Sequence, residues 1–206
     1  MNNTQHQKES TYYHAIVIGV SYGGFNALQC ILPVLPENFP VPVIIVQHIG
    51  PESDSYMISC LNEVCKINVK EAEEKEKLKP GVIYFAPANY HLLIEDNLTF
   101  SLAADGKINF ARPSIDVLFE SAAFALGPRV IGVILTGANS DGSMGLKIIK
   151  DNGGLAVVQD PQTAAAEIMP QAALEVIDAD TILPIEKIGP FLVKHIFYKG
   201  GAKKCE

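Results

Sequence analysis

The chain has 206 residues, of which 48% are hydrophobic and 19% are charged. This length fits one domain, and the composition excludes a disordered or coiled-coil chain. Sixteen basic against 23 acidic side chains leave a net charge of −7, which is a poor match for a phosphate backbone. We therefore expect no nucleic-acid partner.

The four cysteines show neither Cys-x-x-Cys nor zinc-ribbon spacing, which is typical of thiols in a reducing compartment. Residues 1–13 are polar and lack the apolar core of a signal peptide. No apolar run approaches the ~20 residues that a membrane helix requires. We expect a cytoplasmic protein that is not embedded in a membrane, with a disordered tail at 1–13, a folded domain at 14–198 and a C-terminal tail at 199–206.

The first part of the domain alternates between strand and helix. Residues 14–20 are apolar and β-branched, the pattern of a parallel strand that helices cover on both faces. The predicted elements that follow are a helix at 23–32, a strand at 41–46 and a helix at 54–66. This alternation predicts right-handed crossovers and a parallel sheet.

The middle of the chain has a different pattern. A charged run at 70–79 predicts a solvated surface segment. Short strands at 82–86, 92–95 and 98–102, separated by turn residues, predict antiparallel hairpins at one edge of the sheet. Alternation then returns, with helices at 115–126, 143–151, 171–177 and 186–198 and strands at 130–135, 155–159 and 181–183. The sequence predicts a single α/β domain: a doubly wound, mainly parallel sheet flanked by helices, with an antiparallel hairpin insertion.

The sequence Gly19-Val-Ser-Tyr-Gly-Gly24 follows the first predicted strand, where open α/β sheets bind their ligands. As Gly-x-Ser-x-Gly it fits a nucleophile elbow, a sharp turn that presents a serine hydroxyl beside helix N-terminal amides. A phosphate cradle or a purely structural turn are the alternatives. A dinucleotide site needs glycine in place of Ser21 and an acid in place of Gln47, so the elbow is favoured.

His48 follows the second predicted strand, and Asp141 follows a later one. If those strands are neighbours, His48 emerges beside Ser21, where a neutral imidazole can accept the serine proton. Asp141 would then orient the imidazole, as in a Ser-His-Asp triad. Two alternatives stay open: a structural role for His48, and Asp141 as the N-cap of helix 143–151.

The remaining histidines lack the spacing of a metal site, and we expect neither a metal nor a cofactor. They are His6, His14, His91 and His195.

Taken together, these stretches resemble the catalytic domain of the chemotaxis protein-glutamate methylesterases. The similarity covers about residues 14–195 in family order. The matching stretches are 18–24, 46–49, 80–87 with His91, 112–119, 132–137 leading to Asp141, and 158–161 with Met169 and Pro170.

The resemblance implies a serine hydrolase that removes methyl groups from glutamate methyl esters on a chemoreceptor or related signalling protein, and in some relatives also deamidates glutamines. Its nucleophile, base and orienter fall on Ser21, His48 and Asp141. We expect the oxyanion to meet backbone N–H groups of Tyr22 and of the loop around Gly137 and Ala138.

Two departures from the family pattern leave a second function open. Tyr22 stands where the family commonly has threonine, and Ala138 stands where it usually has methionine. A catalytically altered binding or scaffold module of a chemosensory-like pathway is therefore the alternative to an active esterase, and a nucleotide-binding α/β protein is a third class.

Typical family members also carry a receiver domain. Only residues 1–13 precede the first predicted strand, which is too few for a folded regulator. We expect a catalytic domain without a receiver domain, either constitutively accessible or gated by a separate response regulator.

Overall fold

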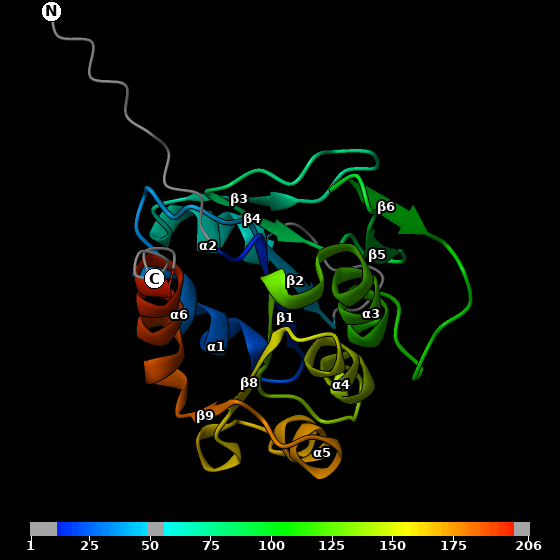
Figure 1. The fold of residues 1–206 in the computed structure, drawn as a ribbon, viewed down its shortest axis with the longest axis vertical. Helices are drawn as coiled ribbons and strands as arrows, with labels where there is room; N and C mark the ends of the chain where they lie inside the picture. The colour runs from blue at the N-terminus through cyan, green and yellow to red at the C-terminus, as the bar shows by residue number, and fades with distance from the viewer. Residues whose placement is uncertain (1–11, 49–55, 200–206) are drawn as a thin grey trace, which may run out of the picture.

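Seven parallel strands form the central sheet of the computed structural model, which describes residues 12–48 and 56–199 (Figure 1). Their order is β3-β4-β2-β1-β7-β8-β9. The strands are β1 (Ala15–Val20), β2 (Val43–Gln47), β3 (Asn68–Glu71), β4 (Val82–Phe85), β7 (Val130–Ile134), β8 (Leu155–Gln159) and β9 (Thr181–Leu183). All six residues of β1 are buried, as expected for a strand that is covered on both faces.

Helices cover both faces of the sheet, and alternate side chains of β1 point to opposite faces. Ile16 and Ile18 face a core that includes α1 (Gly24–Ile31), α2 (Tyr56–Val64) and α6 (Ile185–Lys199). Val17 faces the other core, which includes α3 (Ile115–Leu126), α4 (Ser143–Asp151) and α5 (Ile168–Val176). Figure 1 shows α1 and α6 on one side of the sheet and α3 and α4 on the other. This confirms the predicted doubly wound fold.

The antiparallel insertion is the pair β5 (His91–Ile94) and β6 (Phe100–Ala103), which forms a separate two-stranded sheet. Leu92 and Phe100 belong to the same core as α3, so the hairpin packs over that face of the main sheet.

The interpretation of residues 82–86 as part of a hairpin was wrong. Strand β4 lies in the main sheet, parallel to β2 on one side and to β3 on the other. Strand β3 has a single fully buried side chain, Val69, among polar ones, so its sequence does not look like that of a buried strand. It forms an edge strand that overlaps the start of the charged run, most of which is exposed as predicted.

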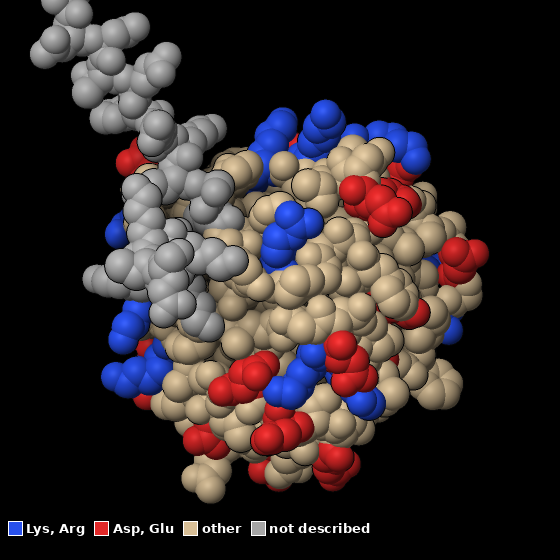
Figure 2. All heavy atoms as spheres, viewed as in Figure 1, with Lys and Arg blue, Asp and Glu red and all other residues tan. Residues whose placement is uncertain are grey.

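Parts of other predictions fall outside the described residues: 1–11 and 200–206 of the two tails, and 54–55 of the second helix. Tyr13, which we assigned to the N-terminal tail, is buried in the core and its hydroxyl lies 3.2 Å from His195 Nε2. No helix of the described chain has both the length and the apolarity needed to cross a bilayer. On the face shown in Figure 2, basic and acidic side chains are interspersed.

The order in which strands are added to the sheet reverses at β1. Helix α1 leads from β1 to β2 on one side, whereas the later strand β7 pairs with β1 on the other side. Ligands of open α/β sheets bind at such a switch point, beyond the carboxyl ends of the strands. The turn after β1, His48 directly after β2 and the loop after β7 meet there.

Candidate active site

The turn after β1 places Ser21 at the carboxyl end of the central strand. Ser21 N–H donates to Thr136 O, and Gly24 N–H donates to Ser21 O, both at 2.9 Å. Gly23 has a φ of 75°, a left-handed conformation that glycine adopts without the Cβ clash of other residues. The chain thereby turns sharply into α1, which is the strand-to-helix geometry of a nucleophile elbow.

His48 lies beside Ser21 because β2 lies beside β1, with Gln47 opposite Val20. His48 Nδ1 is 3.2 Å from Ser21 Oγ. His48 Nε2 is 2.8 Å from Asp141 Oδ2, on the loop after β7. The structure thus brings together Ser21, His48 and Asp141, which are far apart in the sequence.

Asp141 fixes which ring nitrogen of His48 carries the proton. An ionised carboxylate only accepts hydrogen bonds, so His48 Nε2–H donates to Asp141 and Nδ1 keeps its lone pair. Ser21 Oγ–H can donate to that Nδ1, and the Asn139 side-chain amide also lies 3.1 Å from it. The serine hydroxyl therefore has a proton acceptor within hydrogen-bond distance.

The Asp141 carboxylate is fully buried and caps the N-terminus of helix α3. It accepts hydrogen bonds from Ile115 N–H at 2.7 Å, Asp116 N–H at 3.2 Å and the Ser114 hydroxyl at 2.9 Å. Asn109 Nδ2 donates to it at 3.2 Å. Asp141 does not cap the helix that follows it, because α4 has no side-chain cap. The alternative of Asp141 as the N-cap of helix 143–151 was therefore wrong, and its carboxylate caps α3 instead.

The pKa values of two neighbouring carboxyl groups, those of Asp141 and Asp116, are shifted in opposite directions. Burial alone would raise the pKa of Asp141, but hydrogen bonds, above all from His48 and Ile115 N–H, outweigh burial and hold that pKa below its ordinary value. Burial, together with the charge of Asp141, raises the pKa of Asp116, even though Gly145 N–H donates to its Oδ1 at 2.6 Å. Asp141 therefore stays ionised beside the imidazole.

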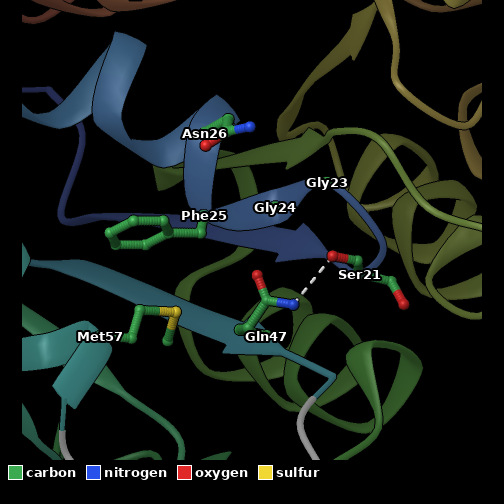
Figure 3. Close-up of a pocket in the computed structure, with 7 residues that line it drawn as sticks. All are labelled: Ser21, Gly23, Gly24, Phe25, Asn26, Gln47 and Met57. Carbon is green, nitrogen blue, oxygen red and sulfur yellow. Dashed lines mark hydrogen bonds between the residues drawn. The ribbon is translucent and has the colours of Figure 1, made fainter.

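The Gln47 side chain connects the turn at Ser21 to the backbone at His48. Its buried side-chain amide donates to Ser21 O at 2.9 Å and to His48 O at 3.1 Å; Figure 3 shows the first of these bonds. Gly24 leaves room for it, since a Cβ there would collide with Gln47 Oε1. In the sequence, Gln47 served only to exclude a dinucleotide site, so its positioning role was missed.

Ser114 and His91 are two further supporting residues that the sequence did not assign. The buried His91 ring accepts Ser114 N–H at Nδ1 (3.2 Å) and donates from Nε2 to Gly106 O (3.1 Å). His91 thus positions the serine that donates to Asp141. The only earlier signal was that both residues lie in stretches that resemble the methylesterases.

A family model described as CheB methylesterase matches residues 16–192. The chain belongs to the CheB methylesterase family. The crystal structure of the Thermotoga maritima CheB methylesterase catalytic domain is similar to this fold, with a TM-score of 0.86 and 37% identity. That match covers 88% of this chain and 98% of the Thermotoga chain.

Relatives of two lengths share this methylesterase domain. A Leptospira interrogans protein is 56% identical over 182 residues, covering 88% of this chain and 94% of that protein. The protein-glutamate methylesterase/protein-glutamine glutaminase of Archaeoglobus fulgidus is 38% identical over 187 residues, covering 89% of this chain but 54% of its own length. The chain thus spans nearly all of one relative and about half of the other, and it is an enzyme of the methylesterase class.

In this CheB-family site, backbone N–H groups near Ser21 are the candidates for stabilising an oxyanion. The N–H groups of Tyr22 and Ala138 meet no acceptor within the described chain, so they are free to donate to a ligand. Gly137 N–H already donates to Ala166 O at 3.1 Å. Gly137 instead provides space, since a Cβ there would lie 3.0 Å from Ser21 Cβ.

Two cavities flank Ser21. The larger, of about 350 Å³, is also lined by His48 and Phe110. The smaller, of about 240 Å³, is lined by Phe25 and Met57 on the Gln47 side (Figure 3). Within the described part of the chain, no three His, Cys, Asp or Glu side chains gather as metal ligands would. The arrangement places the Ser21 hydroxyl between two recesses.

Proposed function

We propose that this chain hydrolyses glutamate γ-methyl esters on a protein through an acyl-serine intermediate. The observation that carries the proposal is the hydrogen-bonded chain from Ser21 Oγ through His48 to the buried Asp141 carboxylate. Such a chain activates a hydroxyl that is otherwise a weak nucleophile at neutral pH.

In the first half of the reaction, Ser21 Oγ attacks the ester carbonyl while His48 Nδ1 takes the serine proton. Asp141 stabilises the imidazolium that forms, and it needs no movement because it already accepts His48 Nε2–H. The tetrahedral intermediate collapses, and methoxide leaves as methanol with the proton from His48. Water, deprotonated by the same nitrogen, then cleaves the acyl-serine and releases the glutamate carboxylate.

The oxyanion of each tetrahedral intermediate would meet the free N–H groups of Tyr22 and Ala138. Both donors are backbone groups near Ser21. Donation therefore does not depend on the threonine and methionine side chains that the family commonly has at positions 22 and 138. One donor of this kind is worth about 3–4 kcal/mol of barrier, or roughly 10²–10³ in rate.

The same chemistry extends to glutamine side chains. Attack on the amide gives the same acyl-serine, with ammonia as the leaving group after protonation by His48. The Archaeoglobus relative carries both activities in its name. We expect a slower reaction on amides, since an amine leaves less readily than an alcohol.

We further propose a methylated chemoreceptor, or a related signalling protein exposed to the cytoplasm, as the substrate. Control by a separate response regulator would appear as a change in methanol release when that regulator and a phosphodonor are added.

A fluorophosphonate probe, combined with methanol release from a γ-methyl-glutamyl peptide, tests the esterase against a scaffold without turnover. We expect stoichiometric labelling of Ser21 and methanol release, with both lost in Ser21→Ala. Ser140→Ala is the matched control, because Ser140 lies on the nearby loop and makes no contact with His48 among the described hydrogen bonds. A wild-type chain that neither labels nor releases methanol would favour the scaffold.

A further inference from the structure

Phe110 has a backbone conformation that is unfavourable for a residue with a side chain. Residues 108–111 form a two-residue hairpin turn, in which Ile108 N–H donates to Ala111 O at 3.1 Å and Ala111 N–H to Ile108 O at 2.9 Å. Asn109 and Phe110 at its tip have φ values of 50° and 63°. Turns with two positive φ angles prefer glycine at the second position, because a side chain there is sterically strained.

Burial of the Phe110 side chain does not offset that strain. The Phe110 side chain is 97% exposed, so it buries almost no apolar surface on folding. A large aromatic ring held in water by a strained backbone indicates a contact with another molecule.

The turn is held at the active site by Asn109, the first of its two tip residues. Asn109 Nδ2 donates to Asp116 Oδ2 at 2.8 Å and lies 3.2 Å from Asp141 Oδ1. The tip is therefore tied to the carboxylate that orients His48, and Phe110 is among the residues at the larger cavity beside Ser21. Figure 1 shows this segment as the excursion between β6 and α3.

Two cations, Lys107 and Arg112, flank the turn and line the same cavity, and none of its lining residues in 12–48 and 56–199 is a carboxylate. Neither Lys107 nor Arg112 forms an ion pair within the described chain. Arg112 Nη1 donates to two backbone carbonyls of its own loop, and its buried Nε has no hydrogen-bond partner among the described residues. In a chain of net charge −7, this is a local basic rim beside an exposed aromatic ring.

We propose that the turn at 108–111 is a recognition element for the substrate protein, with Phe110 as its anchor. The element takes a segment in which the esterified glutamate has an apolar side chain and a carboxylate close by. The apolar side chain packs on Phe110 and the carboxylate lies toward Lys107 and Arg112. This inference rests on the proposed esterase function and names the chemistry of its substrate.

Two synthetic peptides test the proposal, each with one glutamate γ-methyl ester. One has leucine and glutamate within four residues of the ester, and the other has serine and glutamine in their places. Methanol release gives kcat/KM for the wild type, for Phe110→Gly and for Phe124→Ala. Phe124 is the matched control, because it is also an exposed phenylalanine, at 65%, and lines neither cavity beside Ser21.

We expect the wild type and Phe124→Ala to prefer the leucine-glutamate peptide at least tenfold, and Phe110→Gly to lose most of that preference. Phe110→Gly should also unfold at the same or a higher temperature, since glycine relieves the strained φ. A retained preference in Phe110→Gly would overturn the anchor. Equal losses on both peptides with a lower unfolding temperature would overturn it as well, because they indicate a structural role. If the wild type hydrolysed neither peptide, the proposed esterase function itself would fail.

Discussion

Asp141 combines a structural and an electrostatic role in one side chain. Its carboxylate caps helix α3 through Ile115 N–H and at the same time accepts His48 Nε2–H. The cap fixes the carboxylate, and the fixed carboxylate fixes the imidazole tautomer. A neutral amide at this position would keep the size of the side chain while changing what it can donate and accept.

We predict that Asp141→Asn lowers kcat by roughly 10³–10⁴, because the amide no longer holds the proton on His48 Nε2 or stabilises the imidazolium. Methanol release from a γ-methyl-glutamyl peptide measures kcat, and circular dichroism checks the fold. Ser143→Ala provides a matched control at the start of α4, two residues after Asp141, since its hydroxyl donates to Ser140 O and not to Ser21, His48 or Asp141. Retention of more than a tenth of the wild-type kcat would contradict the role of Asp141.

Helices α3 and α4 cap each other with side chains from opposite sides. Asp141, which precedes α4, accepts N–H groups of α3, and Asp116, in the first turn of α3, accepts Gly145 N–H of α4. The start of α3 also packs closely against β1. Gly19 permits it, because a Cβ there would collide with Ile115 Cγ2.

Gly19→Ala should therefore move the start of α3 and weaken its hydrogen bond to Asp141. We expect a loss of about 1–3 kcal/mol in the free energy of unfolding, the usual effect of an added methyl group in a packed core, together with a lower kcat. Urea unfolding and methanol release measure the two effects. Gly106→Ala is the control, since a Cβ there meets no atom within 4 Å. Equal stability of the two variants would contradict the close packing at Gly19.

The sequence predicted the strands that are buried on both faces, and it also placed the exposed edge strand β9 correctly at 181–183. Strands β1, β2, β7 and β8 are continuous apolar runs and were found within one or two residues. Strand β3 was missed because an edge strand with one buried face contains as many polar residues as a loop. Strand β4 was found but given the wrong partners, because a short apolar strand carries no information about the direction of its neighbours.

At the scale of the whole molecule, strand order creates the site. Ser21, His48 and Asp141 follow β1, β2 and β7, which are adjacent only because the chain winds outward from β1 in both directions. Their positions after predicted strands indicated these three residues from the sequence, and the resemblance to the methylesterases pointed to the same three. Supporting groups such as Ser114 and Asn109 could not be found that way, because their contact with Asp141 depends on where α3 and its preceding loop pack.

The two neighbouring carboxyl groups predict how acid affects the stability of the whole fold. The pKa of Asp141 is held below its ordinary value of 3.8, so its stabilising effect is complete above that value and is lost as the pH falls through the lower folded-state pKa. The free energy of unfolding of the wild type should therefore exceed that of Asp141→Asn most clearly at pH 6–7, and the difference should shrink below about pH 4. Asp116 has a raised pKa, so its ionisation opposes folding as the pH rises. The free energy of unfolding of the wild type should therefore fall with rising pH relative to that of Asp116→Asn. Urea unfolding of all three proteins from pH 2.5 to 7 measures both differences. A gap between wild type and Asp141→Asn that stays constant or widens in acid would show that the hydrogen bonds to Asp141 do not favour its ionised form.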